Sequence, residues 1–254
     1  MTGAASALAK QLPSNFWIKE QSFGLLDIDE TELKAFVEAT EGQSIYRVVD
    51  VSKGEELLQA VTALAQELGG VDILHVNAGI NGTWTPIEEL SLDDWDTTIT
   101  TNLRSTFVTV KAAIPFFLKI NGGSIVITSS VNGNRIFKNF GASAYSTSKA
   151  GQVAFMKMAA LELSGYNIRV NAICPGAIST NIDENTAIEE AVEKIKIPIV
   201  FPERERPLRQ ETGIPEQVAN LVLFLSSEDA GNISGTEVYV DGAESFLPAI
   251  PVMV

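Results

Sequence analysis

A tyrosine and a lysine four residues apart, Tyr145 and Lys149, form the pair in this sequence with the most specific chemical potential. They stand in GASAYSTSKAGQVAFMKMAALEL, a segment whose small residues favour one side of a helix. Helical residues i and i+4 share a face, so the Lys149 ammonium is expected beside the Tyr145 phenol. A neighbouring cation lowers a tyrosine pKa from about 10 toward neutrality. The pair could therefore act as a general acid/base without histidine or metal, although most Tyr/Lys pairs at this spacing are ordinary surface contacts.

Composition limits the classes of protein to which the chain can belong. The 254 residues are 45% hydrophobic, which suits a single domain over 1–254 with a full core. A net charge of -14 repels a phosphate backbone, so no nucleic-acid partner is expected. No apolar run approaches the roughly 20 residues needed to span a bilayer, and no signal-peptide pattern opens the chain, so we expect a cytoplasmic protein without a membrane partner. The single cysteine, Cys174, and the single histidine, His75, predict neither disulfides nor a metal site.

Short β-rich runs alternate with longer helical patterns along the chain. Strands are expected at 23–27, 44–50, 72–76, 124–129, 168–174 and 236–240. Helices are expected at 29–40, 54–68, 92–120, around Tyr145 and at 215–227. Because the interior runs are apolar throughout, both sheet faces should be covered. The pattern predicts an α/β fold with a doubly wound, mostly parallel sheet in three αβα layers, with a substrate lid in the proline-rich stretch 181–214.

Polar or small residues follow several of these strands, where ligands bind in open α/β sheets. Asp27, followed by Ile28, ends the first run; its carboxylate could accept hydrogen bonds from a ribose diol and repel a 2′-phosphate, favouring NAD over NADP. The second predicted strand ends at Asp50 and Val51, which could lie along the edge of an adenine ring. Both aspartates could instead cap the helices that follow them.

Three further strand ends complete the candidate site. Asn77, Ala78 and Gly79 follow DILHV, and small residues there allow a ligand to approach the backbone. Ser129 and Ser130 end SIVITS and offer a hydroxyl to a substrate oxygen. A tight Pro-Gly turn and the backbone after it could line a flat ring; these residues are Pro175, Gly176, Ile178 and Thr180.

Together these motifs resemble the short-chain dehydrogenase/reductase family over nearly the whole chain, from about Thr2 to Gly242. The likeness rests on HVNAG, TNLRSTF, ITSSVNG, YSTSK, RVNAICPG and VDGA, in that order. It implies a Rossmann-like fold and hydride transfer between NAD and the carbon of a small-molecule alcohol or carbonyl compound. It also implies a homo-oligomer, a dimer or tetramer.

The same resemblance implies roles for individual residues. Tyr145 would be the proton donor and acceptor, and Lys149 would lower its pKa while contacting the nicotinamide ribose. Ser130, rather than Ser129, would orient the carbonyl, and Asn102 would hold a water that relays protons through Lys149.

The chain departs from the family pattern at its beginning. The glycine-rich turn usually reads TGxxxGxG; here Gly3 is kept, Ala7 and Ala9 replace the other glycines, and Gly3, Ser6 and Leu8 are expected at the cofactor. Pro13 should break the following helix. The first strand is missing or truncated, which should leave its neighbours unpaired unless the natural chain starts earlier. The apolar tail FLPAIPVMV could fill the gap but is expected to pack across a subunit interface.

Two other hypotheses remain open, and these departures favour the first of them. One is a catalytically impaired scaffold or binding protein with a weakened dinucleotide site. The other is a hydrolase that uses Ser130 with Lys149 as base, although no G-x-S-x-G elbow is present. The first hypothesis remains an NAD(P)-dependent oxidoreductase, and the sequence does not identify its substrate.

Overall fold

The computed structural model describes residues 1–4, 22–40, 43–180, 182, 185–197, 199–200, 207–208, 211–247 and 250–251. The strands of the main sheet are β1 (Phe23–Asp27), β2 (Ser44–Val48), β3 (Ile73–Val76), β5 (Gly123–Thr128), β6 (Ile168–Pro175) and β9 (Glu237–Val240). The longer helices are α2 (Glu30–Ala39), α3 (Gly54–Glu67), α4 (Leu92–Ile99), α5 (Ser105–Ile120), α6 (Ser143–Leu163) and α8 (Pro215–Ser226). All of these agree with the predicted elements to within two residues at each end, except that one predicted helix is divided into α4 and α5.

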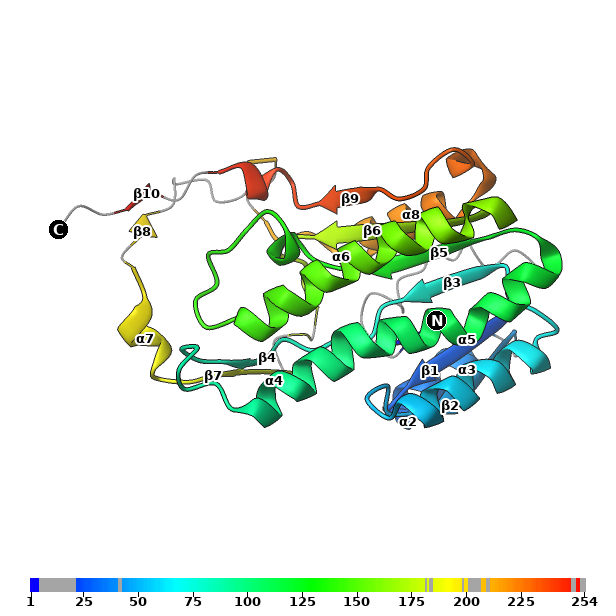
Figure 1. Ribbon diagram of the computed structural model, residues 1–254, viewed down its shortest axis with the longest axis horizontal. Helices are drawn as coiled ribbons and strands as arrows, with labels where there is room; N and C mark the ends of the chain where they lie inside the picture. The colour runs from blue at the N-terminus through cyan, green and yellow to red at the C-terminus, as the bar shows by residue number, and fades with distance from the viewer. Residues whose placement is uncertain are drawn as a thin grey trace.

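The sheet is parallel and doubly wound, as the sequence predicted (Figure 1). β1 pairs with β2, and β3, β5, β6 and β9 pair in that order. All these pairs are parallel, so their carboxyl ends meet at one edge of the sheet. Ligands bind at that edge in folds of this kind.

Helices cover both faces of the sheet and bury one large apolar cluster on one face and two smaller clusters on the other. Figure 1 shows α5 and α6 in front of the strands and α8 behind β6. Successive residues of β5 point to opposite faces of the sheet. Ile125 and Ile127 pack in the cluster under α3, α5 and α6, whereas Val126 packs against α8. This two-sided burial explains why the strands are apolar throughout rather than alternating.

The place of the first strand is held by the first residues of the chain. Thr2 forms parallel bridges to both Leu26 of β1 and Val76 of β3. Its N–H donates to the His75 carbonyl at 3.1 Å, and the Met1 carbonyl accepts from Leu26 N–H at 2.9 Å. Among the described residues, this position of the sheet is a short bridge at Thr2, which joins the two halves of the sheet at its carboxyl-terminal edge.

A cavity of 490 Å³ lies beside this bridge, lined by Gly24 of β1 and by Ile73 and Leu74 of β3. The C-terminal tail does not pair there among the described residues. Its short strand β10 (Ile250–Pro251) pairs antiparallel with β8 (Ile199–Val200) instead. Ala7, Ala9 and Pro13 lie outside the described residues.

Two predicted segments are more structured than their patterns indicated. The helix expected over 92–120 contains a π-helical turn, Thr100–Arg104, between α4 and α5. The stretch expected as an irregular lid contains β7 (Thr186–Ile188), which pairs with β4 (Gly82–Trp84), and a short helix α7 (Val192–Ile195).

His75 and Cys174 lie in the sheet interior. The His75 Nε2 atom is 2.9 Å from the Thr128 hydroxyl, and burial lowers the pKa of the imidazole to about 3, so the ring is neutral. Burial raises the pKa of the Cys174 thiol to about 12. The described residues contain no cluster of three or more side chains suited to a metal, and none of their helices is long and apolar enough to cross a bilayer.

Replacing Thr2 with valine tests the bridge between the sheet halves. The Thr2 hydroxyl accepts from the backbone N–H groups of Asn77 and Ala78 at 3.1 and 3.3 Å, and valine removes this acceptor at nearly constant volume. We expect the free energy of unfolding, measured by urea titration, to fall by about 1–3 kcal/mol. Thr2→Ser keeps the hydroxyl and should lose less. Equal stability of Thr2→Val and the unmodified protein would show that these bonds contribute nothing.

Candidate active site

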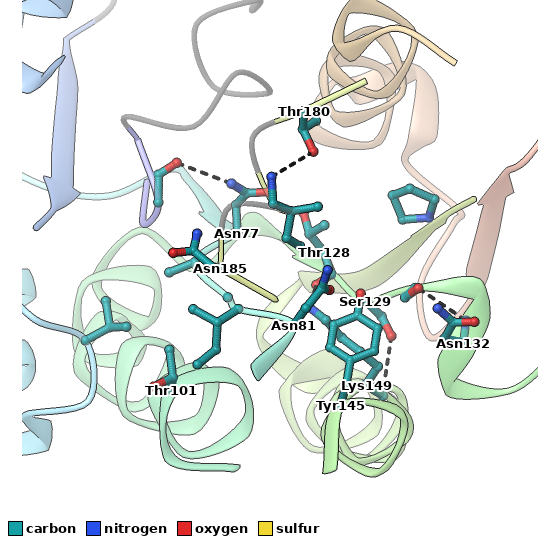
Figure 2. Close-up of a pocket in the computed structure, with 18 of the residues that line it drawn as sticks. Asn77, Asn81, Thr101, Thr128, Ser129, Asn132, Tyr145, Lys149, Thr180 and Asn185 are labelled. Carbon is teal, nitrogen blue, oxygen red and sulfur yellow. Dashed lines mark hydrogen bonds between the residues drawn. The ribbon is translucent and has the colours of Figure 1, made fainter. Parts of the chain in front are cut away.

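A cavity of 1390 Å³ runs past the carboxyl ends of β1, β3, β5 and β6. It is large enough for a dinucleotide and a small substrate together. Most of the sequence-predicted site residues line it: Gly3, Asp27, Ile28, Asp50, Val51, Asn77, Ala78, Gly79, Ser130, Tyr145, Lys149, Pro175, Gly176, Ile178 and Thr180. Figure 2 shows several of them around the hollow, among them Asn77, Tyr145, Lys149 and Thr180. Asn102 lies behind the lining, and Ser6 and Leu8 fall outside the described residues.

The turn after Thr2 is built around a close approach of two backbone segments. Gly3 has φ +64°, and a Cβ there would come within 2.8 Å of the Ala78 nitrogen. The Asn77 side chain donates to the Gly3 carbonyl at 3.3 Å. Glycine is thus required at position 3, and the contact forms one wall of a cradle suited to a dinucleotide.

The end of the cavity at β1 and β2 is acidic. Asp27 Oδ1 accepts from the N–H groups of Ile28 and Asp29 at 2.7 and 3.1 Å, which fixes the carboxylate at the strand end. Asp29 and Asp50 line the same cavity. Asp29 caps α2 through the Glu32 N–H, so the alternative capping role falls to Asp29 rather than Asp27.

Tyr145 and Lys149 lie one turn apart on α6 and are 6% and 3% exposed. The Lys149 ammonium is 5.7 Å from the centre of the Tyr145 ring and donates to the Thr128 carbonyl at 3.1 Å. The cation is therefore beside the phenol, as the helical spacing predicted.

The expected lowering of the Tyr145 pKa is wrong for the protein alone. Burial raises the pKa of Tyr145, and the Ser130 hydroxyl offsets only part of that effect. Burial also lowers the pKa of Lys149 to about 8. Desolvation thus disfavours both charged forms, and an additional charge in the cavity is needed to make the phenolate accessible.

The two serines after β5 have different surroundings. The Ser129 hydroxyl donates to the Lys149 carbonyl at 2.9 Å, so it holds α6 against the strand end. The Ser130 hydroxyl accepts from Asn132 N–H at 3.2 Å and acts on the pKa of Tyr145. This geometry favours Ser130 as the hydroxyl that faces a substrate oxygen.

Asn102 is fully buried in the π-helical turn, and its side chain joins β3 to α6. Its Oδ1 accepts from Ile80 N–H, and its Nδ2 donates to the Ile80 carbonyl and to the Ser148 hydroxyl, each at 2.9 Å. Its backbone carbonyl accepts from Thr106 Oγ1 at 2.7 Å and from Gln152 Nε2 at 3.0 Å. These two donors occupy both lone pairs of the backbone carbonyl, so the side-chain Oδ1, which accepts from Ile80 N–H, is the atom of Asn102 to which the expected relay water would bind.

Several cavity residues were not singled out in the sequence. They are mainly amides and one ion pair: Asn81, Asn132, Asn139, Asn185, Lys138 and Glu244. No local pattern of the sequence marked Glu244, which follows the VDGA motif. Trp84 also lines the cavity.

The arrangement can hold a dinucleotide along the strand ends with a phenol, an ammonium and a serine hydroxyl at the far end. The phenol can exchange a proton with an oxygen in the cavity, and the serine can donate a hydrogen bond to the same atom. Cofactor chemistry supplies hydride, and the protein supplies position and the proton.

Comparisons with known proteins agree with this geometry. A family model described as Enoyl-(Acyl carrier protein) reductase matches residues 3–243. The chain is 34% identical to a 3-oxoacyl-(acyl-carrier-protein) reductase of Thermotoga maritima over 248 residues, 95% of each chain. It is 32% identical to a D-beta-hydroxybutyrate dehydrogenase of Rhizobium meliloti over 226 residues, 87% of this chain and 85% of the relative.

A solved structure gives the same result. The crystal structure of a 3-ketoacyl-ACP reductase from Sinorhizobium meliloti superposes with a TM-score of 0.91 at 39% identity, covering 97% of this chain and 98% of the other. The comparisons give no support to a scaffold or a hydrolase. The chain belongs to the short-chain dehydrogenase/reductase family and is an NAD(P)-dependent oxidoreductase that transfers hydride between nicotinamide and an alcohol or ketone.

Proposed function

We propose that the protein is an NAD-preferring dehydrogenase or reductase in which Tyr145 moves the proton, Lys149 stabilises the phenolate and Ser130 orients the carbonyl. The observation that carries this proposal is the burial of Tyr145 and Lys149 together beside Ser130 at one end of the large cavity. The Cys174 thiol lies near this trio, but burial raises its pKa to about 12, so it stays protonated and does not compete as an acid/base.

The proton steps follow from these positions. In reduction, the Tyr145 hydroxyl donates its proton to the carbonyl oxygen as hydride reaches the carbon, and the C=O bond becomes a C–OH bond. In oxidation, the phenolate accepts the hydroxyl proton of the alcohol. A charged Lys149 stabilises that phenolate, and positive charge on oxidised nicotinamide acts in the same direction.

We assign Asn102 a positioning role. Four of its five hydrogen bonds fix the loop after β3 and the face of α6 that carries Tyr145 and Lys149, and the fifth goes to Thr106 of α5. A π-turn is common at functional sites because the extra residue redirects a side chain. Here it turns Asn102 inward to Ile80 and Ser148, so its contribution reaches the reaction through Lys149's helix.

The preference for NAD rests on charge at the β1–β2 end. Asp27, Asp29, Glu32 and Asp50 line that part of the cavity, and Lys53 is its one cation among the described lining residues. A 2′-phosphate placed there would meet several carboxylates, whereas a ribose diol could donate to Asp27.

Further proposals concern the surroundings of the site. The segment 181–214 would cover the substrate as a lid; its basic and acidic run, Glu203–Arg206 with Arg209, lies outside the described residues.

The outer face of α5 and α6 carries exposed apolar side chains. They belong to Phe107, Met158 and Leu161, which are 47%, 54% and 70% exposed. Apolar side chains on two adjacent helices favour self-association through this face.

Replacing Tyr145 with phenylalanine removes the proposed acid/base and little else. We expect kcat for any accepted alcohol or ketone to fall at least about 1,000-fold, because the alkoxide would form without a proton donor. Cofactor affinity, measured by NADH fluorescence titration, should change by less than about threefold. Tyr166→Phe, at an exposed tyrosine away from the cavity, is the matched control. Near-normal kcat in Tyr145→Phe would refute the assignment.

The cofactor preference can be measured by the same titration. We expect NADH to bind at least about tenfold more tightly than NADPH, since repulsion from Asp27 opposes the extra phosphate. Asp27→Asn should reduce that ratio, whereas Asp229→Asn, at an exposed site outside the cavity, should not. Tighter binding of NADPH to the unmodified protein would contradict the proposal.

A further inference from the structure

An ion pair between Lys138 and Glu244 lies in the wall of the large cavity. The Lys138 Nζ atom is 2.9 Å from Glu244 Oε1, and the two side chains are 27% and 12% exposed. Lys138 belongs to the loop between Ser130 and Tyr145, so the pair lies on the substrate side of the site. Glu244 Oε2 accepts from Ala177 N–H at 3.5 Å, just after the Pro-Gly turn that ends β6.

The loop that carries Lys138 is held by contacts with the C-terminal part of the chain. Asn134 donates to the Glu237 carboxylate and, at 2.6 Å, to the Tyr239 hydroxyl. The Arg135 guanidinium lies over the Tyr239 ring, 3.3 Å from its centre. Lys138 therefore belongs to a loop that is held in place by these contacts. Its ion pair with Glu244 differs in this respect from an ion pair between two exposed, mobile side chains.

Among the described residues, Lys138 is the cation of the cavity wall on the substrate side, and it is paired with Glu244. Among the described residues that line it, three are lysines and none is arginine or histidine. Lys53 follows β2 at the acidic cofactor end, and Lys149 is buried beside the reacting phenol. Lys138 is the third, and the carboxylate of Glu244 neutralises it.

Most of the other polar groups described on the substrate side are uncharged. They are chiefly the amides of Asn81, Asn132, Asn139 and Asn185, several of which are visible in Figure 2. Asp93 and Asp96 of α4 also line the cavity and add negative charge. A substrate here finds donors and acceptors of hydrogen bonds but no uncompensated positive charge among the described groups.

We propose that the Lys138–Glu244 ion pair selects electrically neutral carbonyl and alcohol substrates and rejects analogues that carry a carboxylate near the reacting carbon. This inference rests on the oxidoreductase function proposed above and specifies its substrate class. A carboxylate that approaches Lys138 also approaches Glu244, so attraction and repulsion largely cancel. The free energy of hydration that the carboxylate loses on entering the cavity is then not offset by attraction to the ion pair. The neutral substrate, which loses less hydration, is favoured.

The test compares matched neutral and anionic ketones. Pyruvate, acetoacetate and levulinate, each with its methyl ester, are reduced with NADH near neutral pH, where the three acids are ionised. For the unmodified protein we expect kcat/KM to be roughly 100-fold higher for the best ester than for its acid.

Two variants should move this ratio in opposite directions. Glu244→Gln keeps the shape of the side chain but removes the negative charge beside Lys138, so the ester-to-acid ratio should fall about tenfold, mainly through a lower KM for the acid. Lys138→Met leaves the carboxylate and should raise the ratio. The exchanged pair, Lys138→Glu with Glu244→Lys, preserves neutrality and should keep the ratio within about threefold of the original.

The outcomes separate this inference from the function on which it rests. Ester reduction that persists while the ratio stays constant in Glu244→Gln, or preferential reduction of acids by the unmodified protein, would overturn the selection role and leave the oxidoreductase intact. A ratio that falls equally in both single variants would point to damage of the loop and would also overturn it. Absence of turnover with every ester and acid would count against both proposals.

Discussion

The site depends on the desolvation of a phenol and an ammonium placed one helical turn apart. Tyr145 and Lys149 are both almost fully buried, and burial raises the pKa of the first and lowers that of the second to about 8. Neither charged form is strongly favoured in the protein alone. Charge that enters the cavity therefore has a large effect on the phenol, because little water remains to screen it. The fold therefore positions the phenol and the ammonium, and the pKa of the phenol depends on the charge of the group that binds beside it.

The fold maintains this arrangement through contacts at the carboxyl edge of the sheet. Ser129 ties the Lys149 backbone to β5, and Asn102 ties the loop after β3 to α6. At the cofactor side, Thr2 and Gly3 contact Asn77 and Ala78 closely enough to exclude a side chain at position 3. The bridge at Thr2 joins the two halves of the sheet beside the large cavity.

The sequence predicted the elements and most of the site because its signals were local. Apolar strands flanked by helices specify a parallel sheet, and the strand ends then bring Asp27, Asn77 and Pro175 to one edge. Two features depended on tertiary packing and were not predictable in this way. The Asn102 carbonyl is saturated by Thr106 and Gln152, and the pKa of Tyr145 is set by burial rather than by the neighbouring lysine alone. The pair between Lys138 and Glu244 joins residues 106 positions apart, and no periodic pattern relates them.

The central claim is that Tyr145, despite the neighbouring Lys149, becomes acidic only when a further positive charge enters the cavity, and its pKa can be measured directly. NMR titration of protein labelled with carbon-13 at the tyrosine ring would follow the four tyrosines, with Tyr145→Phe identifying the signal. We expect Tyr145 in the free protein to titrate above its usual value of about 10. We expect its pKa to fall by at least about one unit when NAD⁺ is added, and to fall less in Lys149→Met. A Tyr145 pKa that is already near neutral in the free protein, or that does not change with NAD⁺, would contradict the account.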